Sequence, residues 1–365
     1  MARPNIGRDE IALVESVLRS GTLSLGERVV EFEATLAAQI GRAQAIACSS
    51  GTAGLHLAVR GLGIADGDEV ITTPFSFVAS ANCVLYERAK PRFVDIEEVT
   101  LGLDPELVDA AAGGRTRALL PVHVFGKPCR IEELASLASD KGWFLIEDAC
   151  EALGSASRGR PMGSFGDASV LAFYPNKQIT TGEGGMVLTD DPELRAALAS
   201  MRNQGRDADG TWLRHVRLGF NYRLDELSAA LGVVQVQRLA ELRSGRDGVV
   251  RSYEQRLRDR EWVTLPTVEA GTSVDWFVYV VRLAKSIDRD RVITRLASRG
   301  IPARPYFSPL HLQPFYRAEF GYRPGDFPVT ERVASSTLAL PFSSLHTDDD
   351  IDQVCKALID VVADA

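Results

Sequence analysis

Short apolar runs alternate with amphipathic segments over the first half of the chain. Apolar positions recur at helical spacing from 9 to 19 and from 27 to about 40, and Gly21 ends the first pattern. Strands are predicted at 43–48, 69–73, 91–95, 118–123 and 143–148, and further helices follow residue 52, open at 75–79 and cover 131–141. Strands that alternate with helices predict an α/β domain with a mainly parallel sheet.

The pattern changes after residue 190. Helical spacing dominates to about residue 243, with a long helix predicted from Leu224. The remaining pattern is a strand at 277–283, a helix at 290–299, a strand-poor segment rich in proline and aromatic residues at 301–327, and a final helix at 348–365. We therefore predict a large domain at 1–244, including the N-terminal helices, and a smaller α+β domain at 245–365.

Composition and charge exclude several classes of function. With 365 residues and a formal charge of −8, the chain is long enough for two domains and too acidic to favour nucleic acid or an anionic membrane as partner. The N-terminus lacks the apolar core of a signal peptide, and no apolar run reaches transmembrane length. The five cysteines are scattered without a CxxC pair. These features predict a cytoplasmic protein without a zinc site.

One lysine stands on a loop with strong conformational signals. Lys177 follows Pro175 and Asn176, which break a strand, and precedes glycines at 182, 184 and 185, which force a tight turn before a strand at 186–189. A lysine held beside a core is suited to Schiff-base chemistry, because desolvation lowers the ammonium pKa and favours the neutral nucleophile. The alternative is an ordinary connection between strands with an exposed lysine.

A second feature is the turn at 49–52, between a predicted strand and a helix. Its sequence is Ser-Ser-Gly-Thr. Small residues let a ligand approach the backbone, and the free N–H groups at a helix start favour an anion. A phosphate would fit there, with the Thr52 hydroxyl as a further donor. The alternative is simple helix capping by Ser50 or Thr52.

These features converge at predicted strand ends, where ligands gather in parallel sheets. Asp148 ends one strand, Lys177 follows another, and the turn at 49–52 follows a third. Pyridoxal phosphate needs a lysine, an acid beside its ring nitrogen, a phosphate cradle and an apolar face, for which Phe77 is the candidate. A nicotinamide cofactor is the rival, but the glycines at 61, 63 and 67 lack the context of a dinucleotide-binding turn.

Four ordered motifs resemble the DegT/DnrJ/EryC1/StrS family of sugar aminotransferases. They are Ser-Ser-Gly-Thr-Ala at 49–53, Ile-Glu-Asp-Ala-Cys-Glu-Ala at 146–152, Asn-Lys-Gln-Ile-Thr-Thr-Gly-Glu-Gly-Gly at 176–185 and Gly-Phe-Asn-Tyr-Arg-Leu at 219–224. The runs at 309–314 and 341–342 match as well, so the resemblance covers nearly the whole chain. Within the family, the second and third motifs look most like those of perosamine synthases.

The resemblance implies a fold-type-I, homodimeric, pyridoxal-phosphate-dependent enzyme with shared active sites. It implies amination of a nucleotide-linked keto-6-deoxy sugar, at C4 in perosamine-synthase-type enzymes, with L-glutamate as the amino donor. By analogy, Lys177 forms the Schiff base and carries the proton, Asp148 pairs with the ring nitrogen, Phe77 stacks on the ring, Ser50, Gly51 and Thr52 bind the phosphate, and Asn221 reaches the phosphate of the neighbouring subunit.

Two positions depart from the family pattern. Many members carry serine five residues before the lysine, where this chain has Ala172, so one phosphate donor is replaced by another group. Many carry glutamine or histidine three residues after the aspartate, near the cofactor's O3′, where this chain has Glu151. A carboxylate would repel that phenolate, so we expect Glu151 to be protonated, turned aside or shielded by a base.

The substrate-binding candidates are Ser24, Tyr174, Arg223 and His311. Ser24 lies in a polar loop bounded by glycines. A guanidinium fork suits either the donor carboxylate or a pyrophosphate, which makes Arg223 a candidate. Tyr174 and also His123 are candidates for lining the pocket or for packing. His311 lies in the proline- and aromatic-rich segment, which we expect to approach the sugar nucleotide, and a structural role is the alternative for this histidine.

Other functions remain alternatives at this point. A 3-keto sugar aminotransferase would carry the same motifs. The family's sugar dehydratases replace the Schiff-base lysine with histidine, so Lys177 argues against them. A non-catalytic cofactor-binding regulator would not need Lys177 beside Asp148, and an amino-acid aminotransferase is a fourth possibility.

Overall fold

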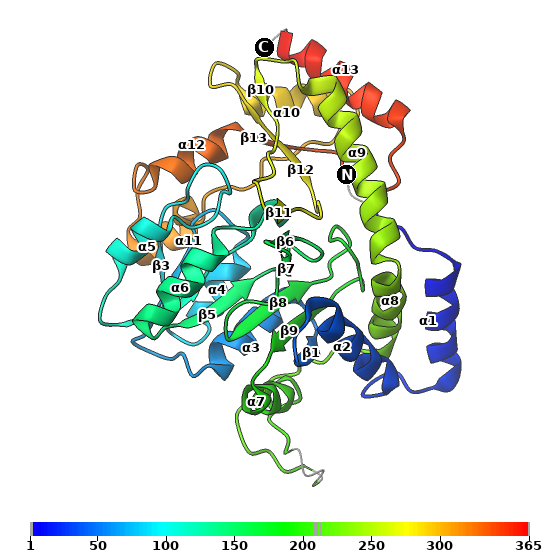
Figure 1. Ribbon diagram of the computed structural model, residues 1–365, viewed down its shortest axis with the longest axis vertical. Coiled ribbons are helices and arrows are strands. Elements are labelled where there is room, and N and C mark those ends of the chain that lie inside the picture. Colours follow the sequence, from blue (N-terminus) through cyan, green and yellow to red (C-terminus); the bar gives the residue numbers. More distant parts are fainter. Residues whose placement is uncertain (1–2, 208–210, 212, 364–365) are drawn as a thin grey trace.

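The computed structural model describes residues 3–207, 211 and 213–363. Its larger part is built on a seven-stranded sheet in the order β1-β9-β8-β5-β4-β2-β3 (Figure 1). From β3 to β8 the neighbouring strands are parallel, and β9 is antiparallel to both of its neighbours. The strands are β1 (Gln44–Cys48), β2 (Glu69–Thr72), β3 (Lys90–Phe93), β4 (Thr116–Leu120), β5 (Phe144–Asp148), β8 (Ala168–Ala172) and β9 (Gly185–Thr189). The mainly parallel α/β sheet is confirmed.

Successive strand residues point to opposite faces of this sheet, and apolar side chains lie on both faces. Helices therefore cover each face. Along β4, Ala118 and Leu120 join one hydrophobic core and Leu119 joins the other. The first core is closed by α3 (Gly51–Gly61), α4 (Ala79–Leu85) and α7 (Pro192–Arg202). The second is closed by α2 (Glu27–Ile40), α5 (Pro105–Ala111), α6 (Ile131–Lys141) and α8 (Glu226–Gln237), and α1 (Arg8–Ser20) packs on α8.

A separate core lies at the other end of the molecule, at the top of Figure 1. It surrounds a three-stranded antiparallel sheet in the order β10-β12-β13. Its elements are α9 (Leu239–Leu257), β10 (Val263–Thr264), β12 (Tyr279–Leu283), α10 (Arg289–Ser298), β13 (Thr337–Leu340) and α13 (Asp348–Ala363). The predicted boundary between residues 244 and 245 falls inside α9, and the division at that point stays a prediction.

Short elements connect the two parts. In one three-stranded sheet, β11 of the C-terminal region pairs with β6 of the larger part. The remaining elements are η1 (Val124–Gly126), β6 (Ala156–Ser157), β7 (Arg160–Pro161), β11 (Thr272–Ser273), η2 (Leu310–Leu312), α11 (Pro314–Phe320) and α12 (Pro328–Ser336). The segment at 301–327 contains no strand where it is described, as its composition predicts.

Three local predictions need correction. The helix expected to open at Phe75 begins at Ala79, because Thr73 Oγ1 accepts the Phe75 N–H at 3.0 Å and the chain bends there. The long helix expected from Leu224 is two helices, α8 and α9, which meet at Arg238. The described residues between α7 and α8, at 203–207, 211 and 213–225, contain no helix, although helices were expected to dominate there. The outermost predicted residues, 1–2 and 364–365, lie outside the described part.

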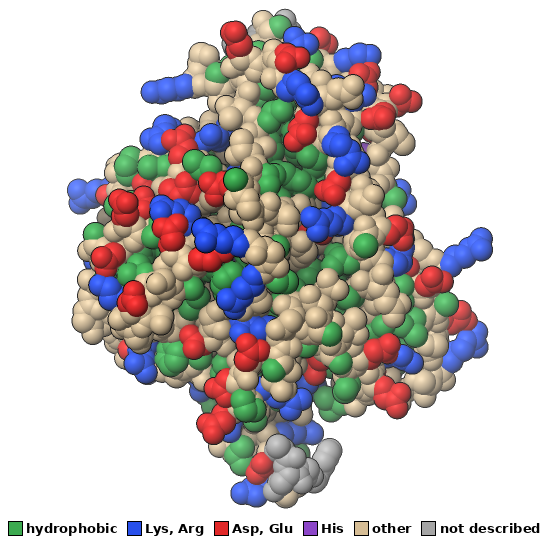
Figure 2. All heavy atoms as spheres, viewed as in Figure 1, with side chains coloured by type: hydrophobic (Ala, Val, Ile, Leu, Met, Phe, Trp, Pro, Cys, Tyr) green, Lys and Arg blue, Asp and Glu red, His purple; other side chains and the backbone are tan. Residues whose placement is uncertain are grey.

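The surface carries mixed charge. Lys and Arg side chains lie among Asp and Glu side chains over the face shown in Figure 2. Every helix in the described part of the chain is too short or too polar to cross a membrane. The same residues contain no group of three or more His, Cys, Asp or Glu side chains placed to hold a metal ion. All five cysteines are free thiols.

Candidate active site

A pocket of about 510 Å³ opens at the carboxyl ends of β5 and β8, beside the start of α3. Its wall brings together eight of the residues proposed from the sequence. They are Ser50, Gly51, Thr52, Phe77, Asp148, Glu151, Tyr174 and Lys177. Parallel strands gather such residues because their carboxyl ends share one edge of the sheet.

Lys177 is held by a folded loop between β8 and β9. Its N–H donates to the Tyr174 carbonyl at 2.9 Å, and the Thr181 N–H donates to the Phe173 carbonyl at 3.0 Å. Gly182 has φ +81°, which a side chain would disfavour. The Lys177 side chain is 13% exposed, and its Nζ lies 3.4 Å from a Glu151 oxygen and 4.3 Å from the centre of the Phe277 ring. The amine is thus directed into the pocket.

Asp148 lies at the last position of β5 and is 4% exposed. Its Oδ2 accepts the Ser80 hydroxyl at 2.7 Å, and its Oδ1 accepts the Cys150 N–H at 3.1 Å. Ser80 then accepts from Ser76 at 2.8 Å, because its own proton is directed at Asp148. Two donors leave part of the capacity of the carboxylate for a ligand in the pocket.

Glu151 is buried and turned toward Lys177. Its Oε2 accepts the Phe125 N–H at 2.8 Å, and its Oε1 is the oxygen 3.4 Å from Lys177 Nζ. Burial raises the pKa of this carboxyl, although Lys177 acts in the opposite direction. Of the three states expected from the sequence, the structure disfavours a carboxyl turned aside, because Glu151 faces Lys177, a nearby base. Burial and Lys177 act on the pKa of Glu151 in opposite directions, so the protonated and the shielded states both stay open.

The first turn of α3 is the candidate phosphate cradle. Ser50 caps the helix, because its side chain accepts the Ala53 N–H at 3.1 Å. Gly51 and Thr52 are the first helical residues, and their N–H groups lack carbonyl partners within the helix. A Cβ placed on Gly51 would lie only 2.7 Å from the Cβ of Ala172 and 3.1 Å from Cys150 Sγ. Glycine at 51 therefore lets the start of α3 pack closely against Ala172 of β8, and Gly51 and Thr52 line the pocket.

Several pocket residues escaped the sequence analysis. Phe277, Tyr306 and Phe307 reach the pocket from the C-terminal part of the chain, and Ser76, Ser80 and Cys150 come from the larger part. Ser76 and Ser80 could have been found as two serines four residues apart after a predicted strand end. The aromatic side chains carry no local signal, because only the tertiary fold brings them to Lys177.

Phe77 and Tyr174 offer exposed aromatic faces. Phe77 is 61% exposed and Tyr174 is 52% exposed, although both line the pocket. Large exposed aromatic side chains beside a cavity are suited to binding a ring or an apolar edge of a ligand. This placement agrees with the stacking role proposed for Phe77.

The remaining candidates lie outside this pocket of their own chain. Ser24 is exposed in the loop before α2, Asn221 is exposed between α7 and α8, and Arg223 donates to Asn203 at 2.9 Å. His311 is fully buried, pairs with Glu331 at 3.0 Å and packs against Phe327. These contacts fit the structural alternative, and a substrate contact by His311 stays a prediction.

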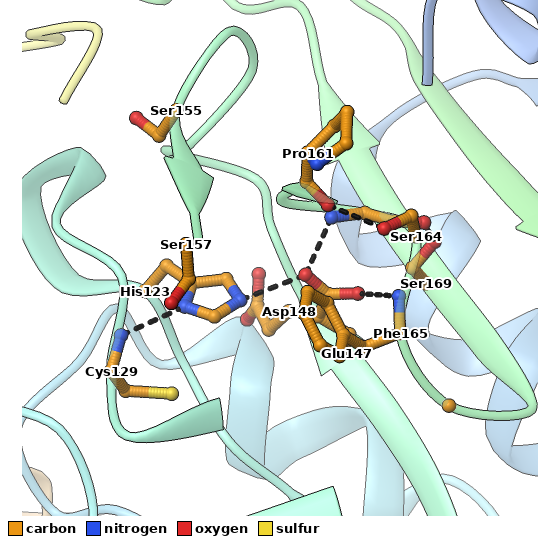
Figure 3. A network of polar contacts seen from close by, with 12 residues as sticks. His123, Cys129, Glu147, Asp148, Ser155, Ser157, Pro161, Ser164, Phe165 and Ser169 are labelled. Carbon is orange, nitrogen blue, oxygen red and sulfur yellow. Dashed lines mark hydrogen bonds and ion pairs between the residues drawn. The ribbon is translucent and has the colours of Figure 1, made fainter. Parts of the chain in front are cut away.

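His123 also lies outside the pocket, in a network on the opposite side of β5 (Figure 3). Its Nδ1 accepts the Cys129 N–H at 3.1 Å, which places the imidazole proton on Nε2, 2.9 Å from Glu147. Glu147 also accepts the N–H groups of Gly163 and Phe165. The His123 N–H donates to the Asp148 carbonyl at 3.1 Å, so this network fixes the end of β5.

The residues of the pocket fit pyridoxal phosphate. A buried carboxylate with spare acceptor capacity suits the protonated ring nitrogen, and the open helix start suits the phosphate. Lys177 lines the same pocket as these two groups, and Phe77 offers a face for the ring. This donor set agrees with each requirement of the cofactor.

Comparison with known proteins gives the same result. The model of the DegT/DnrJ/EryC1/StrS aminotransferase family matches residues 4–359. GDP-perosamine synthase of Caulobacter vibrioides is 38% identical over 367 residues, which cover 99% of this chain and 98% of that protein. The aminotransferase TlmJ from Streptoalloteichus hindustanus has a TM-score of 0.93 and 32% identity, and the match covers 100% of this chain and 98% of that one.

A third relative bears on the chemistry. The structure of S. venezuelae DesV, in complex with a ketimine intermediate, matches with a TM-score of 0.91 and 33% identity over 99% of this chain and 98% of that one. The predictions of family, fold class and cofactor are thereby confirmed. The chain belongs to the DegT/DnrJ/EryC1/StrS family and is a pyridoxal-phosphate-dependent sugar aminotransferase.

Proposed function

We propose that the enzyme transfers an amino group from L-glutamate to C4 of a nucleotide-linked 4-keto-6-deoxy sugar. The observation that carries the transamination is the shared pocket, in which the Lys177 amine and the Asp148 carboxylate line one cavity. The similarity to GDP-perosamine synthase supports the C4 position and the nucleotide-linked substrate. Amination at C3 is the second candidate, because the same pocket residues would serve it.

Each pocket residue has a distinct task in this proposal. The bound cofactor supplies a ring that withdraws electrons from a breaking C–H bond. Asp148 holds a proton at the ring nitrogen, since two donors fix its carboxylate beneath the pocket. Lys177 Nζ binds the cofactor and moves the proton of the substrate, and Glu151 and Phe277 limit where that amine can lie.

We further propose a cytoplasmic homodimer with shared active sites. Asn221 is exposed on a segment that is tied to the phosphate cradle, because the Ser49 N–H donates to the Tyr222 carbonyl at 2.8 Å. The Tyr222 hydroxyl also lies 3.1 Å from His56 of α3. A fixed, exposed amide beside one cradle is suited to donate to the phosphate in the partner's site.

A substrate panel tests the reaction. The purified enzyme is incubated with L-glutamate and either 4-keto or 3-keto nucleotide sugars, and 2-oxoglutarate and the amino sugar are measured. We expect equal amounts of both products with a 4-keto sugar, and NMR should place the new amine on C4. Amination at C3 alone would favour the second candidate. Formation of a dehydrated sugar without 2-oxoglutarate would contradict the proposed transamination.

A further inference from the structure

A second buried polar cluster lies behind the Lys177 loop. Arg246 of α9 is 8% exposed, and its Nη2 donates to the main-chain carbonyls of Lys177, at 3.0 Å, and of Gln178. These carbonyls belong to the segment that directs the Lys177 amine into the pocket. A guanidinium that bridges two consecutive carbonyls restricts the rotation of the peptide group between them.

Asp275 is the acidic partner of this arginine. It is fully buried, and its Oδ1 lies 3.9 Å from Arg246 Nη1. Within the described residues, neither its carboxylate oxygens nor Arg246 Nη1 has a hydrogen-bond partner. Burial raises the pKa of Asp275 to about 7, although Arg246 acts in the opposite direction. An acid without such partners is costly to bury, so packing alone does not explain an aspartate here.

The surrounding backbone leaves space for this acid. A Cβ on Gly154 would come within 2.4 Å of Asp275 Oδ2, and a Cβ on Gly126 within 2.9 Å of the Asp275 carbonyl. Both glycines have positive φ, +87° and +85°. The Asp275 N–H donates to Ser155 Oγ at 2.9 Å, which anchors the same segment to the larger part of the molecule.

The cluster reaches the pocket along two routes. Gln178 Nε2 donates to the carbonyls of Glu151, at 2.5 Å, and Asp275, at 2.8 Å. Phe277, two residues after Asp275, places its ring 4.3 Å from Lys177 Nζ. The segment at 275–277 therefore contacts the amine of Lys177 through Phe277. It also lies beside Arg246, which binds the main chain of the Lys177 loop.

We propose that Arg246 and Asp275 are positioning residues for the reaction at Lys177. Arg246 fixes the carbonyls of the lysine loop, and Asp275 fixes the orientation of Arg246. Neither side chain touches the substrate. The inference rests on the role proposed above for Lys177, and it links α9 and the segment before β12 to the reacting amine.

The test compares variants of the holoenzyme. Arg246→Met should lower kcat by about tenfold or more, as expected for the loss of a charge-assisted hydrogen bond, and should change KM for L-glutamate much less. It should also shift the pH midpoint of the visible absorbance change of the bound cofactor. Arg251→Met is the matched control, because Arg251 is exposed on the same helix.

Two further variants keep the test decisive if Arg246→Met does not fold. Arg246→Lys retains the charge but cannot bridge two carbonyls and face Asp275, so we expect partial recovery of kcat and of the absorbance midpoint. Asp275→Asn should change kcat and the absorbance midpoint in the same direction as Arg246→Met does. Unchanged kcat and midpoint in the folded variants would overturn the inference.

Failure of the inference can be separated from failure of the proposed function. Borohydride reduction of the wild-type holoenzyme, followed by peptide mapping, locates the lysine that binds the cofactor. A label on Lys177 together with unaffected Arg246 variants would reject only the positioning role. A label on another lysine would reject the role of Lys177 itself, and the inference with it.

Discussion

Glu147 and Asp148 are consecutive residues of β5, and their side chains point to opposite faces of the same sheet. Glu147 is fully buried and accepts hydrogen bonds from His123, Gly163 and Phe165 (Figure 3). Asp148 lines the pocket and accepts from Ser80 and the Cys150 N–H. The Glu147 carboxylate is enclosed by hydrogen-bond donors of the protein. The Asp148 carboxylate faces the pocket and can still accept a hydrogen bond from a ligand there.

This difference separates a structural carboxylate from the carboxylate that we propose to act on the cofactor. The three donors around Glu147 come from two segments, one with His123 and one with Gly163 and Phe165, so removal of its charge should weaken the fold. The donors around Asp148 hold its carboxylate in place and leave it directed at a ligand. Sequence position at a predicted strand end indicated Asp148, but nothing in the sequence indicated the donors that enclose Glu147.

The largest expected effect is on the pocket side. Lys177→Ala should abolish turnover, because no other described lysine lines the pocket. The variant should still unfold near the wild-type temperature, since the Lys177 amine makes only a 3.4 Å contact with Glu151 and a 4.3 Å contact with the Phe277 ring. Turnover with the sugar substrate and thermal unfolding measure the two effects. An active Lys177→Ala enzyme would contradict the proposal that the pocket with Lys177 and Asp148 is the active site.

Asp148→Asn should follow, with a loss of turnover of about 100-fold or more. Asparagine keeps the size of the side chain, but it cannot hold the ring nitrogen protonated as a carboxylate does. Cofactor retention should persist in part, as measured by absorbance after gel filtration. Near-normal turnover would exclude Asp148 from the role at the ring nitrogen.

The pocket elements can be predicted from sequence to a large extent. Lys177, Asp148 and the turn at 49–52 follow strands, and a parallel sheet brings such positions to one edge. The network of Glu147 and the cluster of Arg246 could not be predicted, because they join segments distant in the chain. The burial of His311 could not be predicted either, because its position in a proline-rich segment does not reveal whether its side chain is buried.

Asn221 is the residue that we propose to complete the pocket of the partner chain. Asn221→Ala should weaken cofactor retention by about tenfold, the equivalent of one hydrogen bond to a charged phosphate. Mixing Lys177→Ala with Asn221→Asp should restore activity in hybrid dimers, because one composite site would then be intact. Proven hybrids without activity would leave Asn221 with a local role only.

Glu147→Gln should show the opposite pattern. Replacing the carboxylate should lower the free energy of unfolding by about 1–3 kcal/mol, because three buried donors lose a charged acceptor. Turnover per folded molecule should change far less than in Asp148→Asn. Denaturant unfolding and active-site titration measure the two quantities. If turnover falls as much as in Asp148→Asn while stability is unchanged, the two faces of β5 do not differ in function.

The smallest expected effect concerns Glu151. Because burial raises its pKa in the folded protein, the folded state retains a proton that the unfolded state loses. Its contribution to stability therefore falls as the pH rises above the usual glutamate pKa of about 4.3. Without cofactor, Glu151→Gln should gain stability relative to wild type over that range. If the difference in unfolding free energy between Glu151→Gln and wild type stays constant from about pH 4 to about pH 8, the raised pKa is contradicted.

The position of the cofactor can be measured directly. Borohydride reduction of the holoenzyme fixes the C=N link, and peptide mass mapping then identifies the lysine. Lys127 is the internal control, because it is also buried but lies in another cavity, where its Nζ donates to the Val99 carbonyl at 2.6 Å. We expect one phosphopyridoxyl group per chain, on Lys177. A label on Lys127, or no labelled lysine in the fully loaded enzyme, would contradict the assignment of the active site.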